Sequence, residues 1–409
     1  MSPTVKSSRG KGQVQWSDGV WKALDQAVLE EMKRTRVGAK FLPLVHVPEK
    51  QTTVEANVVI VPLSAAAAEK AGAAFDSALS VDESQTNRIQ EYWTAFRLSA
   101  AQVQAEEHEE MQPNNRGPST AVSLALRAAN ILAQAEDLVL FNGQNAAVNS
   151  PLFTGENVQY SDRNLNLDLD CGLLKVRPVQ PVVSSVENNI LLPVTQVIPV
   201  HPSVLGNAGS APRYAENTLN VVSQGISALQ GLGHYENYAL VLHTVPYADI
   251  YQALPDTLIE PAEPISHLVK AGIYGTSALP PFAPVTSGSA PGSVPVLSGL
   301  PTGIVTPATS TTPAGTTLLS SMVQFNSSPL LLPAGSTPGP AAVLYTGVLV
   351  SLSGNTMDLV RGVTEDSLDV SVIFDQKDQN EQYRFRVAQR FALRLKDPTA
   401  VILLLFLDS

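Results

Sequence analysis

Cysteine and long apolar runs are nearly absent from this chain. Cys171 is the only cysteine in 409 residues, which excludes an internal disulfide and a multi-cysteine metal site. The longest strongly apolar run, residues 400–407, is far shorter than the roughly 20 residues that a membrane-spanning helix needs. Residues 1–16 carry positive charge but no apolar segment, so they do not resemble a secretory signal. We therefore expect a cytoplasmic protein without a membrane anchor.

Positive charge is also in short supply. The chain has 26 Lys and Arg against 37 Asp and Glu, which gives a formal net charge of −11. Proteins that coat nucleic acid need clustered Lys and Arg to neutralise the phosphates. The charge balance therefore argues against nucleic acid as a partner.

Catalytic and metal-binding motifs are missing as well. The sequence has no nucleophile elbow, no phosphate-binding P-loop and no strand-linked dinucleotide motif. His108 begins a stretch similar to the H-E-x-x-H zinc motif, but Gln112 replaces the second histidine. A di-iron site needs carboxylates from several helices, so we predict that Glu106 and Glu107 lie on a solvated acidic helix. The other histidines are scattered: His46, His201, His234, His243 and His267. We predict no catalytic residue, no metal site, no cofactor and no enzyme activity.

The most informative stretch that is present runs over residues 119–143. Most positions before Glu136 are apolar or small, and a helix that is apolar on all sides is usually a buried one. Ser119 is suited to cap its start and Gly143 to end it. We expect this helix to be a spine against which the other elements pack.

Two patterns flank the spine on its N-terminal side. Residues 21–37 predict an amphipathic helix with Trp21, Leu24, Val28 and Met32 on one stripe. This stripe suits packing on the chain's own domain, and it also suits the binding of a partner peptide. The strand-like patterns at 52–63 and 89–98 predict a β-ribbon that leaves the body and reaches a neighbour.

The second half of the chain alternates regular and irregular segments. We predict helices at 217–232 and 247–254, a buried strand at 238–243 and closing strands within 359–407, with a turn at Asp397-Pro398. Residues 400–407 predict a fully buried strand. Residues 144–213 are irregular, with short strand-like runs at 173–176, 182–186 and 194–200. Residues 271–357 contain no charged residue, and we predict a β-rich insertion that orders by packing on itself or on a neighbour.

Four stretches in order resemble the encapsulins, linocin-like shell proteins with the Hong Kong 97-type fold of tailed-phage major capsid proteins. WKALDQAVLEEMKRTRVGAKF (residues 21–41) is similar to the family's N-terminal helix, and ALRAANILAQAEDLVLFNG (residues 125–143) to its spine helix. NYALVLHTVPYADIYQAL (residues 237–254) resembles the first strand and helix of the axial domain. FALRLKDPTAVILLLF (residues 391–406) resembles the closing strands.

The resemblance implies an α+β chain with this capsid fold and a definite division into parts. Residues 1–44 would form an N-terminal helical arm and 45–90 an extended β-ribbon loop. Residues 91–144 and 344–409 would form the peripheral domain with the spine helix. Residues 214–343 would form the axial domain. Two β-rich insertions, 145–213 and 280–342, would be additions to a standard shell subunit.

In function, the resemblance implies a homo-oligomeric icosahedral shell that encloses a cargo enzyme, of an iron-storage or peroxidase type. Relatives capture the cargo through its short C-terminal targeting peptide, and the matching apolar docking candidates are Trp21, Leu24, Val28 and Phe41. The family often has an arginine and an aspartate just after the N-terminal helix, whereas this chain has Ala39 and Pro43. That departure puts the usual peptide specificity in question.

The resemblance also implies a pore. Residues 251–260 match the loop that lines the family's five-fold opening, which gives Tyr251, Gln252, Asp256 and Glu260 as candidates. The carboxylates of Asp256 and Glu260 would form a negative rim that favours cations such as Fe²⁺, although these two residues are equally typical of ordinary loop acids.

Two other functions remain open at the level of sequence. A fold of this type also serves as the major capsid protein of a virus or prophage, and fold alone does not separate the two. About twenty residues precede the first predicted helix, which leaves no room there for a long scaffolding segment. A bacteriocin or hydrolase is the third reading, and it lacks a signal peptide and a nucleophile–base pair.

Overall fold

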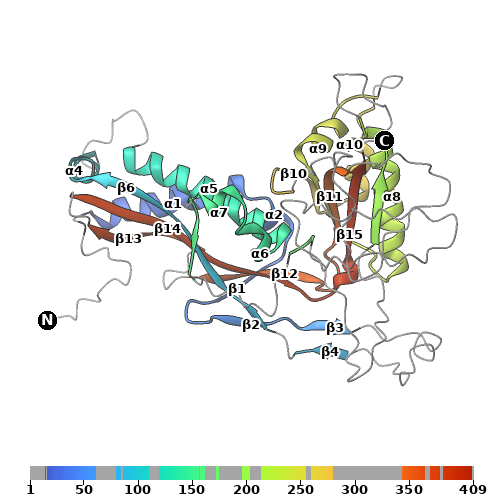
Figure 1. The fold of residues 1–409 in the computed structure, drawn as a ribbon, viewed down its shortest axis with the longest axis horizontal. Helices are drawn as coiled ribbons and strands as arrows, with labels where there is room; N and C mark the ends of the chain where they lie inside the picture. The colour runs from blue at the N-terminus through green and yellow to red at the C-terminus, as the bar shows by residue number, and fades with distance from the viewer. Residues whose placement is uncertain are drawn as a thin grey trace, which may run out of the picture.

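The structure is a computed structural model. It describes residues 14, 16–60, 80–83, 86–109, 119–155, 157–161, 172–174, 196–202, 213–254, 259–279, 343–363, 369–377 and 381–407. The described residues form two bodies side by side, each with its own sheet, and a ribbon of short strands that runs beneath them (Figure 1). In this part of the chain, no helix combines the length and the apolar character needed to cross a membrane.

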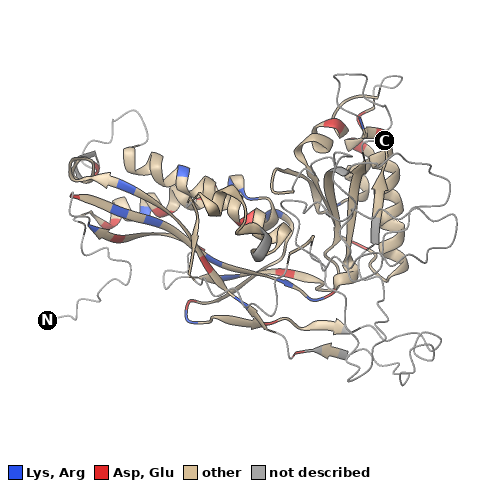
Figure 2. Cartoon of the chain, viewed as in Figure 1, with Lys and Arg blue, Asp and Glu red and all other residues tan. Residues whose placement is uncertain are grey.

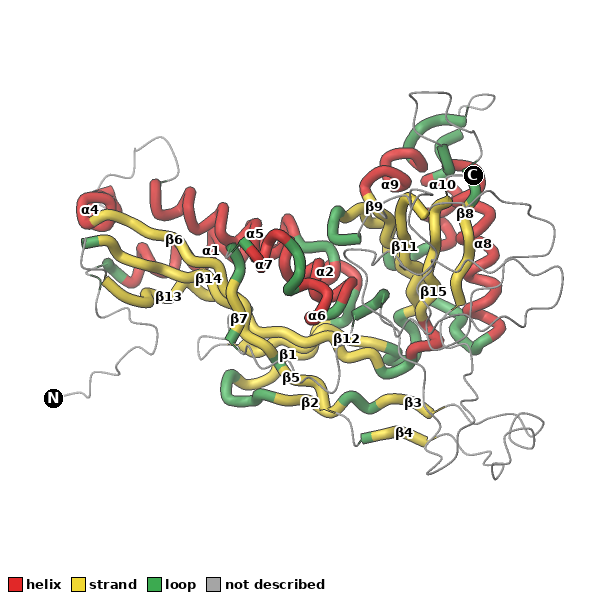
Figure 3. Tube along the Cα trace, viewed as in Figure 1, coloured by secondary structure: helices red, strands yellow, loops and turns green. Residues whose placement is uncertain are grey.

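The longest helix, α5 (Thr120–Asn142), is the predicted spine. The Ser119 hydroxyl accepts a hydrogen bond from Val122 N (3.2 Å) and so caps the first turn. Gly143 ends the helix at φ +76°, a conformation that glycine adopts without steric cost. Helix α1 (Asp18–Thr35), capped by Ser17, packs along α5. Figure 3 shows the two helices on the same side of the left-hand sheet.

The left-hand sheet, called here the peripheral sheet, has the strand order β1-β12-β14-β6-β7, with β13 also paired to β14. Its strands are β1 (Leu44–Pro48), β6 (Gln90–Ser99), β7 (Gln159–Tyr160), β12 (Met357–Val363), β13 (Val370–Lys377) and β14 (Gln382–Leu395). The short helices α2 (Gly38–Phe41), α4 (Ala100–Glu109), α6 (Gln144–Ala147) and α7 (Pro151–Thr154) lie in the same body. Phe385, Val387 and Phe391 of β14 face the helices and join their apolar core.

The right-hand sheet, called here the axial sheet, has the order β10-β9-β11-β15-β8. Its strands are β8 (Gln196–Val200), β9 (Tyr238–His243), β10 (Gly272–Thr276), β11 (Val343–Ser351) and β15 (Val401–Leu407). Helices α8 (Ala215–Gly231), α9 (Thr244–Ile250) and α10 (Ala262–Leu268) belong to this body. All seven residues of β15 are buried, which is why an unbroken apolar run suits this inner strand.

The ribbon consists of two short antiparallel pairs. Strand β2 (Thr53–Glu55) pairs with β5 (Thr86–Arg88), and β3 (Val58–Ile60) pairs with β4 (Ser80–Asp82). Asn57, at φ +51°, separates β2 from β3. The ribbon leaves the peripheral sheet after β1 and returns to it at β6.

Most of the predicted elements are confirmed with small changes of boundary. The N-terminal helix, the spine, the helix after residue 214, the strand at 238–243 and the last strand are all present. The predicted turn is the 3-10 helix at Pro398–Ala400, where the Asp397 carboxylate accepts from Thr399 N. The predicted strand at 194–200 is β8. The closing strands include one continuous 14-residue strand, β14, where the alternation suggested two strand lengths.

Some expectations are wrong or fall elsewhere. Residues 173 and 174 form a turn instead of a strand, because their backbone N–H groups bond to the carbonyl oxygens of Leu140 and Phe141 at the end of the spine. The single arm expected at 52–63 is divided into two strands. The strand-like run at 182–186, the insertion at 280–342 and Cys171 lie outside the described residues.

Candidate functional site

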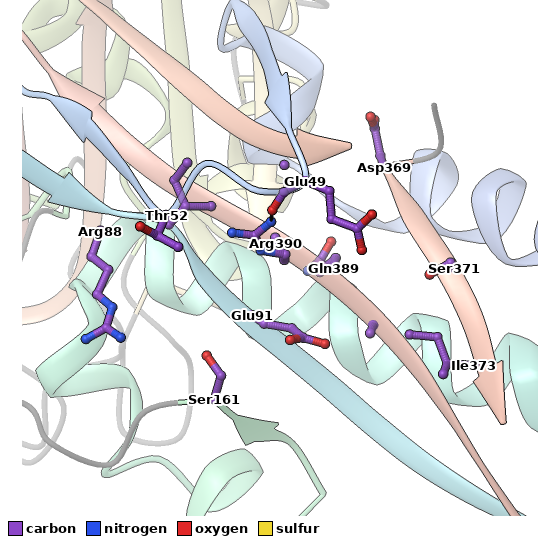
Figure 4. A pocket seen from close by; sticks show the side chains of 13 residues that line it. Glu49, Thr52, Arg88, Glu91, Ser161, Asp369, Ser371, Ile373, Gln389 and Arg390 are labelled. Carbon is purple, nitrogen blue, oxygen red and sulfur yellow. Dashed lines mark hydrogen bonds between the residues drawn. The ribbon is translucent and has the colours of Figure 1, made fainter. Parts of the chain in front are cut away.

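The peripheral sheet carries a groove on the face opposite α1 and α5, called here the ribbon face. The groove has a volume of about 350 Å³ and opens between the ribbon base and β13 (Figure 4). Its floor is formed by β13, β14 and β6, and its rim by the β1–β2 turn and residue 161. The lining residues are Glu49, Thr52, Arg88, Ile89, Glu91, Ser161, Gly362, Asp369, Ser371, Ile373, Ala388, Gln389 and Arg390.

The base of the ribbon is fixed against this face. Val47, Val54, Ile89, Val360 and Ala392 form a small apolar cluster between ribbon and sheet. Burial of such side chains contributes about 1.5–3 kcal/mol for each large aliphatic residue. The base therefore belongs to the folded body of its own chain.

Hydrogen bonds hold the ribbon in register with the sheet. Arg390 donates to the carbonyl oxygens of Gln51 (2.7 Å) and Glu49 in the β1–β2 turn. The Asn87 amide donates to the Leu393 carbonyl oxygen (2.9 Å), and Val59 N donates to the Lys396 carbonyl oxygen (2.8 Å). These bonds fix the direction in which the ribbon leaves the sheet.

The outer part of the ribbon is much less covered. Val81 on β4 is 51% exposed, and Glu55 and Glu83 are exposed. In the described residues, β3 and β4 pair only with each other as a strand pair. An isolated two-stranded ribbon is marginally stable in water, and its open edges are templates for another chain. The arrangement is suited to protein–protein contact.

The groove itself is lined by charged side chains of both signs. It mixes the acids Glu49, Glu91 and Asp369 with the cations Arg88 and Arg390. In the part of the chain that the structure describes, no three His, Cys, Asp or Glu residues lie close enough to hold a metal ion. The Ser161 hydroxyl donates to the Gln90 side-chain oxygen (3.1 Å). Acidic and basic side chains along a shallow groove can bind both the main chain and the side chains of an extended peptide segment.

On the opposite face of the sheet, a buried ion pair joins the spine to the sheet. Arg361 on β12 donates to Glu136 on α5, and both side chains are at most 2% exposed. Arg361 also contacts Asp369 (3.4 Å), and His46 lies 3.0 Å from the other oxygen of Asp369. The Arg36 guanidinium is 4.0 Å from Asp369. A buried pair of this kind is costly to break, because one partner is left as an unpaired buried charge.

The next spine residue, Asp137, holds the junction between α1 and α2. Its carboxylate accepts from Val37 N (2.8 Å) and Gly38 N (2.8 Å). Burial, with a smaller contribution from the nearby Glu136, raises the pKa of Asp137 to about 7 against the opposing effect of the two N–H donors. A Cβ at Gly38 would lie 2.5 Å from Leu140 Cδ1, so a larger residue there would require the Leu140 side chain to move. Adjacent acids on the spine thus position the sheet and the N-terminal helix.

The prediction that Glu106 lies on a solvated acidic helix is wrong for this residue. The helix exists as α4, but Glu106 is only 6% exposed, and its carboxylate accepts from Ala121 N (2.8 Å) in the first turn of the spine. The N-terminus of a helix has unsatisfied N–H groups and a partial positive charge, which together favour a carboxylate. The side chains of Glu107 and His108 lie outside the described residues.

Replacing Glu106 by Ala is expected to lower the free energy of unfolding by about 1–2 kcal/mol, because a buried N–H loses its acceptor. Denaturant unfolding of the unassembled chain measures this loss. Glu106→Gln keeps a carbonyl acceptor and serves as the control, with an expected loss of less than half that size. Equal losses for the two variants would show that the hydrogen bond to Ala121 N is not the cause.

The four docking candidates belong to one large apolar core and lie inside the chain. Trp21, Leu24 and Val28 are at most 1% exposed and Phe41 is 7% exposed. Trp21 makes a ring contact with Phe385 of β14 (centroids 6.2 Å apart), and Phe41 with Tyr274 of β10 (5.6 Å). The stripe therefore packs on the chain's own domain, as the first of its two readings predicted. The periodicity of an amphipathic helix shows that one face is buried but not what buries it.

The pore-loop candidates are only partly described. Tyr251, Gln252 and Glu260 are exposed beside α9 and α10, whereas Asp256 lies outside the described residues. Partial burial and the Tyr247 hydroxyl raise the pKa of Tyr251 to about 12, and the two rings are in contact (5.1 Å). Leu254 N bonds to the Ile259 carbonyl oxygen (3.2 Å) and closes the base of the loop. Their role at a pore stays a prediction.

Sequence reasoning missed two sets of site residues. The first set joins the spine to its neighbours and consists of Glu136, Asp137 and Arg361, and the second set lines the ribbon face. A signal for the first was available, because Glu136 and Asp137 interrupt an otherwise apolar helix. A signal for the second was the recurrence of arginine at every second or fourth position from 384 to 394. The partners of these residues are distant in sequence and carry no local pattern.

The order of the elements decides the fold. An N-terminal helix and a ribbon precede a long spine, an axial sheet follows it, and the last strands return through both sheets. This order agrees with the Hong Kong 97-type capsid fold that the sequence resemblance implies. No protein-family model and no curated protein matches its sequence.

Several solved structures resemble this fold. The virus-like particle from Pyrococcus furiosus is 12% identical, with a TM-score of 0.48 over 94% of this chain and 98% of that one. An empty GTA particle capsid is 14% identical, with a TM-score of 0.43 over 91% and 96%. The SrpI encapsulin from Synechococcus elongatus is 12% identical, with a TM-score of 0.37 over 91% and 88%. Likeness at this level concerns the course of the chain and not its function.

Proposed function

We propose that this chain is a self-assembling shell protein of an encapsulin-type nanocompartment in the cytoplasm. The observation that supports this most directly is the ribbon, whose base is fixed to the sheet while its outer part is exposed. A segment of this kind costs stability in a lone monomer unless a neighbouring copy covers it. Identical subunits with one such donor segment close into rings and cages when the interface angle is right.

In this proposal the shell encloses a cargo enzyme and admits small molecules or ions through openings between subunits. Cargo docking at Trp21, Leu24, Val28 and Phe41 stays a prediction, and these side chains are buried in the lone chain. The axial loop between Tyr251 and Glu260 is the proposed lining of an opening, with Glu260 as its described acid. The runner-up function, a viral or prophage capsid, uses the same assembly and differs in what is enclosed.

Electron microscopy and size-exclusion chromatography of the purified full chain test the proposal. We expect closed particles that contain a companion protein and no genomic nucleic acid. Particles filled with genomic nucleic acid would favour the viral capsid. A chain that stays monomeric under all assembly conditions would contradict both.

Replacing Val81 by Lys tests the ribbon as the donor segment. Val81 is 51% exposed in the monomer, so the change should leave folding intact, as circular dichroism can verify. A lysine buried at a subunit contact is expected to lower particle yield about tenfold or more, since an unpaired buried charge costs well over 1.4 kcal/mol. Ala23→Lys, at an exposed position of α1, is the matched control and is expected to assemble normally.

A further inference from the structure

Helix α9 follows strand β9 without a loop, and a histidine lies at the junction (Figure 3). His243 is the last residue of β9 and the N-cap of α9. Its Nδ1 accepts a hydrogen bond from Val245 N (3.3 Å) in the first turn of the helix. The first N–H groups of a helix have no partner within it, so an acceptor at this position stabilises the start of the helix. An imidazole differs from the usual caps because its charge changes near neutral pH.

The ring of His243 is enclosed by neighbouring strands of the axial sheet. The residue is 8% exposed, and its ring stacks on Tyr345 of β11 (centroids 4.9 Å apart, planes at 24°). Strand β9 lies between β11 and β10, and Thr276 is the register partner of His243 on β10. Tyr345 in turn contacts Tyr214 at the start of α8 (6.3 Å). These contacts hold the ring at the first turn of α9.

The elements packed around the ring carry few charges. Strands β9, β10 and β11 contain no Asp, Glu, Lys or Arg, and Figure 2 shows them without acidic or basic residues. The one carboxylate of α9, Asp249, accepts from Arg213 Nε (3.1 Å) and from two backbone N–H groups at the start of α8. The acid in the first turn of α8, Glu216, is exposed. The other titratable groups beside the ring are the tyrosine hydroxyls of the stacked rings.

A second proton on the ring is incompatible with its role as a cap. Burial lowers the pKa of His243 from its ordinary value of 6.5, so the folded chain holds a neutral ring at neutral pH. A neutral ring that accepts at Nδ1 carries its proton on Nε2. When Nδ1 is protonated it becomes a donor, and the hydrogen bond from Val245 N is lost. A positive charge is also unfavourable beside the positive end of a helix.

Two other parts of the axial body depend on α9. The helix has only seven residues, so its first turn is a large share of it. Asp249, near its end, holds the start of α8 through the two N–H groups. Tyr251, the C-cap, contacts the ring of Tyr247 (centroids 5.1 Å apart). The loop that follows is closed at its base by the bond from Leu254 N to the Ile259 carbonyl oxygen (3.2 Å).

We propose that His243 is a pH-sensitive helix cap: when its ring takes a second proton, the first turn of α9 opens and the base of the following loop loosens. Because the lowered pKa makes the unfolded chain bind the proton more readily than the folded chain, the stability of this region falls as the pH falls below about 6.5. The cap belongs to the single chain and does not depend on assembly. Its consequence for a shell, faster passage of solutes through the openings in acid, rests on the proposed function.

Hydrogen exchange of the full chain at about pH 7.5 and about pH 5 tests the cap. We expect the protection factors of residues 245–252, corrected for the intrinsic pH dependence of exchange, to fall about tenfold in acid, as loss of an N-cap produces. His243→Asn keeps an acceptor at the cap position but does not titrate, so its protection factors should change by less than about twofold. His267→Asn, which replaces an exposed histidine of α10, is the matched control and should behave as the wild type.

The outcomes separate the cap from the proposed function. Equal losses of protection in the wild type and in His243→Asn would overturn the cap. A wild-type loss that is as large in β15, two strands from β9 in the sheet, would overturn it too, and this comparison decides if His243→Asn does not fold.

Assembled particles test the consequence for the openings. Uptake of a small fluorescent dye by wild-type particles should be faster at about pH 5 than at about pH 7.5, and uptake by His243→Asn particles should not change. Equal uptake by the wild type at both pH values would overturn the role at an opening. A chain that shows the expected exchange but forms no particles would support the cap and refute the shell.

Discussion

The stability of the chain is expected to fall by about 4 kcal/mol, relative to an Asp137→Asn variant, as the pH rises from about 4 to about 8. Burial raises the pKa of Asp137 from 3.8 in the unfolded chain to about 7 in the folded chain. Between these values the folded state binds the extra proton, so raising the pH favours unfolding. Each pKa unit corresponds to about 1.4 kcal/mol, which gives the size of the effect.

The comparison with Asn isolates this one carboxyl group. Denaturant unfolding of the unassembled wild-type and variant chains at a series of pH values gives the two curves, and the titration of all other groups cancels in their difference. Asn keeps one oxygen that can accept from Val37 N or Gly38 N. If the difference in free energy of unfolding between the wild type and the variant stays constant across the pH range, the pKa of Asp137 is not raised in the folded chain.

Breaking the buried Glu136–Arg361 pair is expected to cost about 3–5 kcal/mol of unfolding free energy, because the remaining partner loses its closest opposite charge inside the core. Glu136→Ala leaves Arg361 with Asp369 (3.4 Å) as its nearest carboxylate. Both members of the pair are at most 2% exposed, so water cannot replace the lost contact without opening the core. Denaturant unfolding measures the loss.

Two controls accompany this measurement. Replacing both members at once, as Glu136→Leu with Arg361→Met, is expected to recover at least half of the loss, because no buried charge is left unpaired. Arg34→Ala removes the partner of Glu31 in a surface pair (2.8 Å) in which Arg34 is 76% exposed, and should cost less than about 1 kcal/mol. Similar losses at the buried and the surface pair would contradict the account.

Both predictions concern the place where three elements of different parts of the chain meet. Glu136 binds the peripheral sheet, Asp137 binds the α1–α2 junction, and Glu106 caps the first turn of the same spine. A shell closes only if its subunits hold a fixed shape. In the proposed shell, a weakened contact at Glu136, Asp137 or Glu106 should therefore affect assembly as well as stability, even though none of these residues lies at the ribbon.

The elements that local chemistry specifies were predictable from the sequence. Ser119 and Gly143 bound the spine as expected, because capping and the left-handed glycine depend on neighbouring residues only. The last strand was predictable because seven successive apolar residues fit a strand buried on both faces. The strand pattern at 52–63 was predicted as one arm, and the break at Asn57, where φ is +51°, was missed.

The site was less predictable than the fold. The apolar stripe of α1 was correctly seen, but Trp21 and Phe41 contact Phe385 and Tyr274, which lie more than two hundred positions away. The acidic pattern around Glu106 suggested a solvent-exposed helix. In the structure the Glu106 carboxylate accepts a hydrogen bond from Ala121 N in the first turn of the spine. The arginines of β14 were visible as an alternation, yet only the register with β6 shows that Arg97 stands opposite Arg384.

By itself, the sequence determined where helices and strands begin and end, which faces are apolar, and the capsid-like order of the parts. These properties depend on caps, periodicity and turn residues that act over a few positions. Only the tertiary structure decided which charged residues are buried together and which are left facing outward on the sheet. The reason is that a charge is stabilised by whatever partner the fold brings to it, and for Glu136 that partner is 225 positions away.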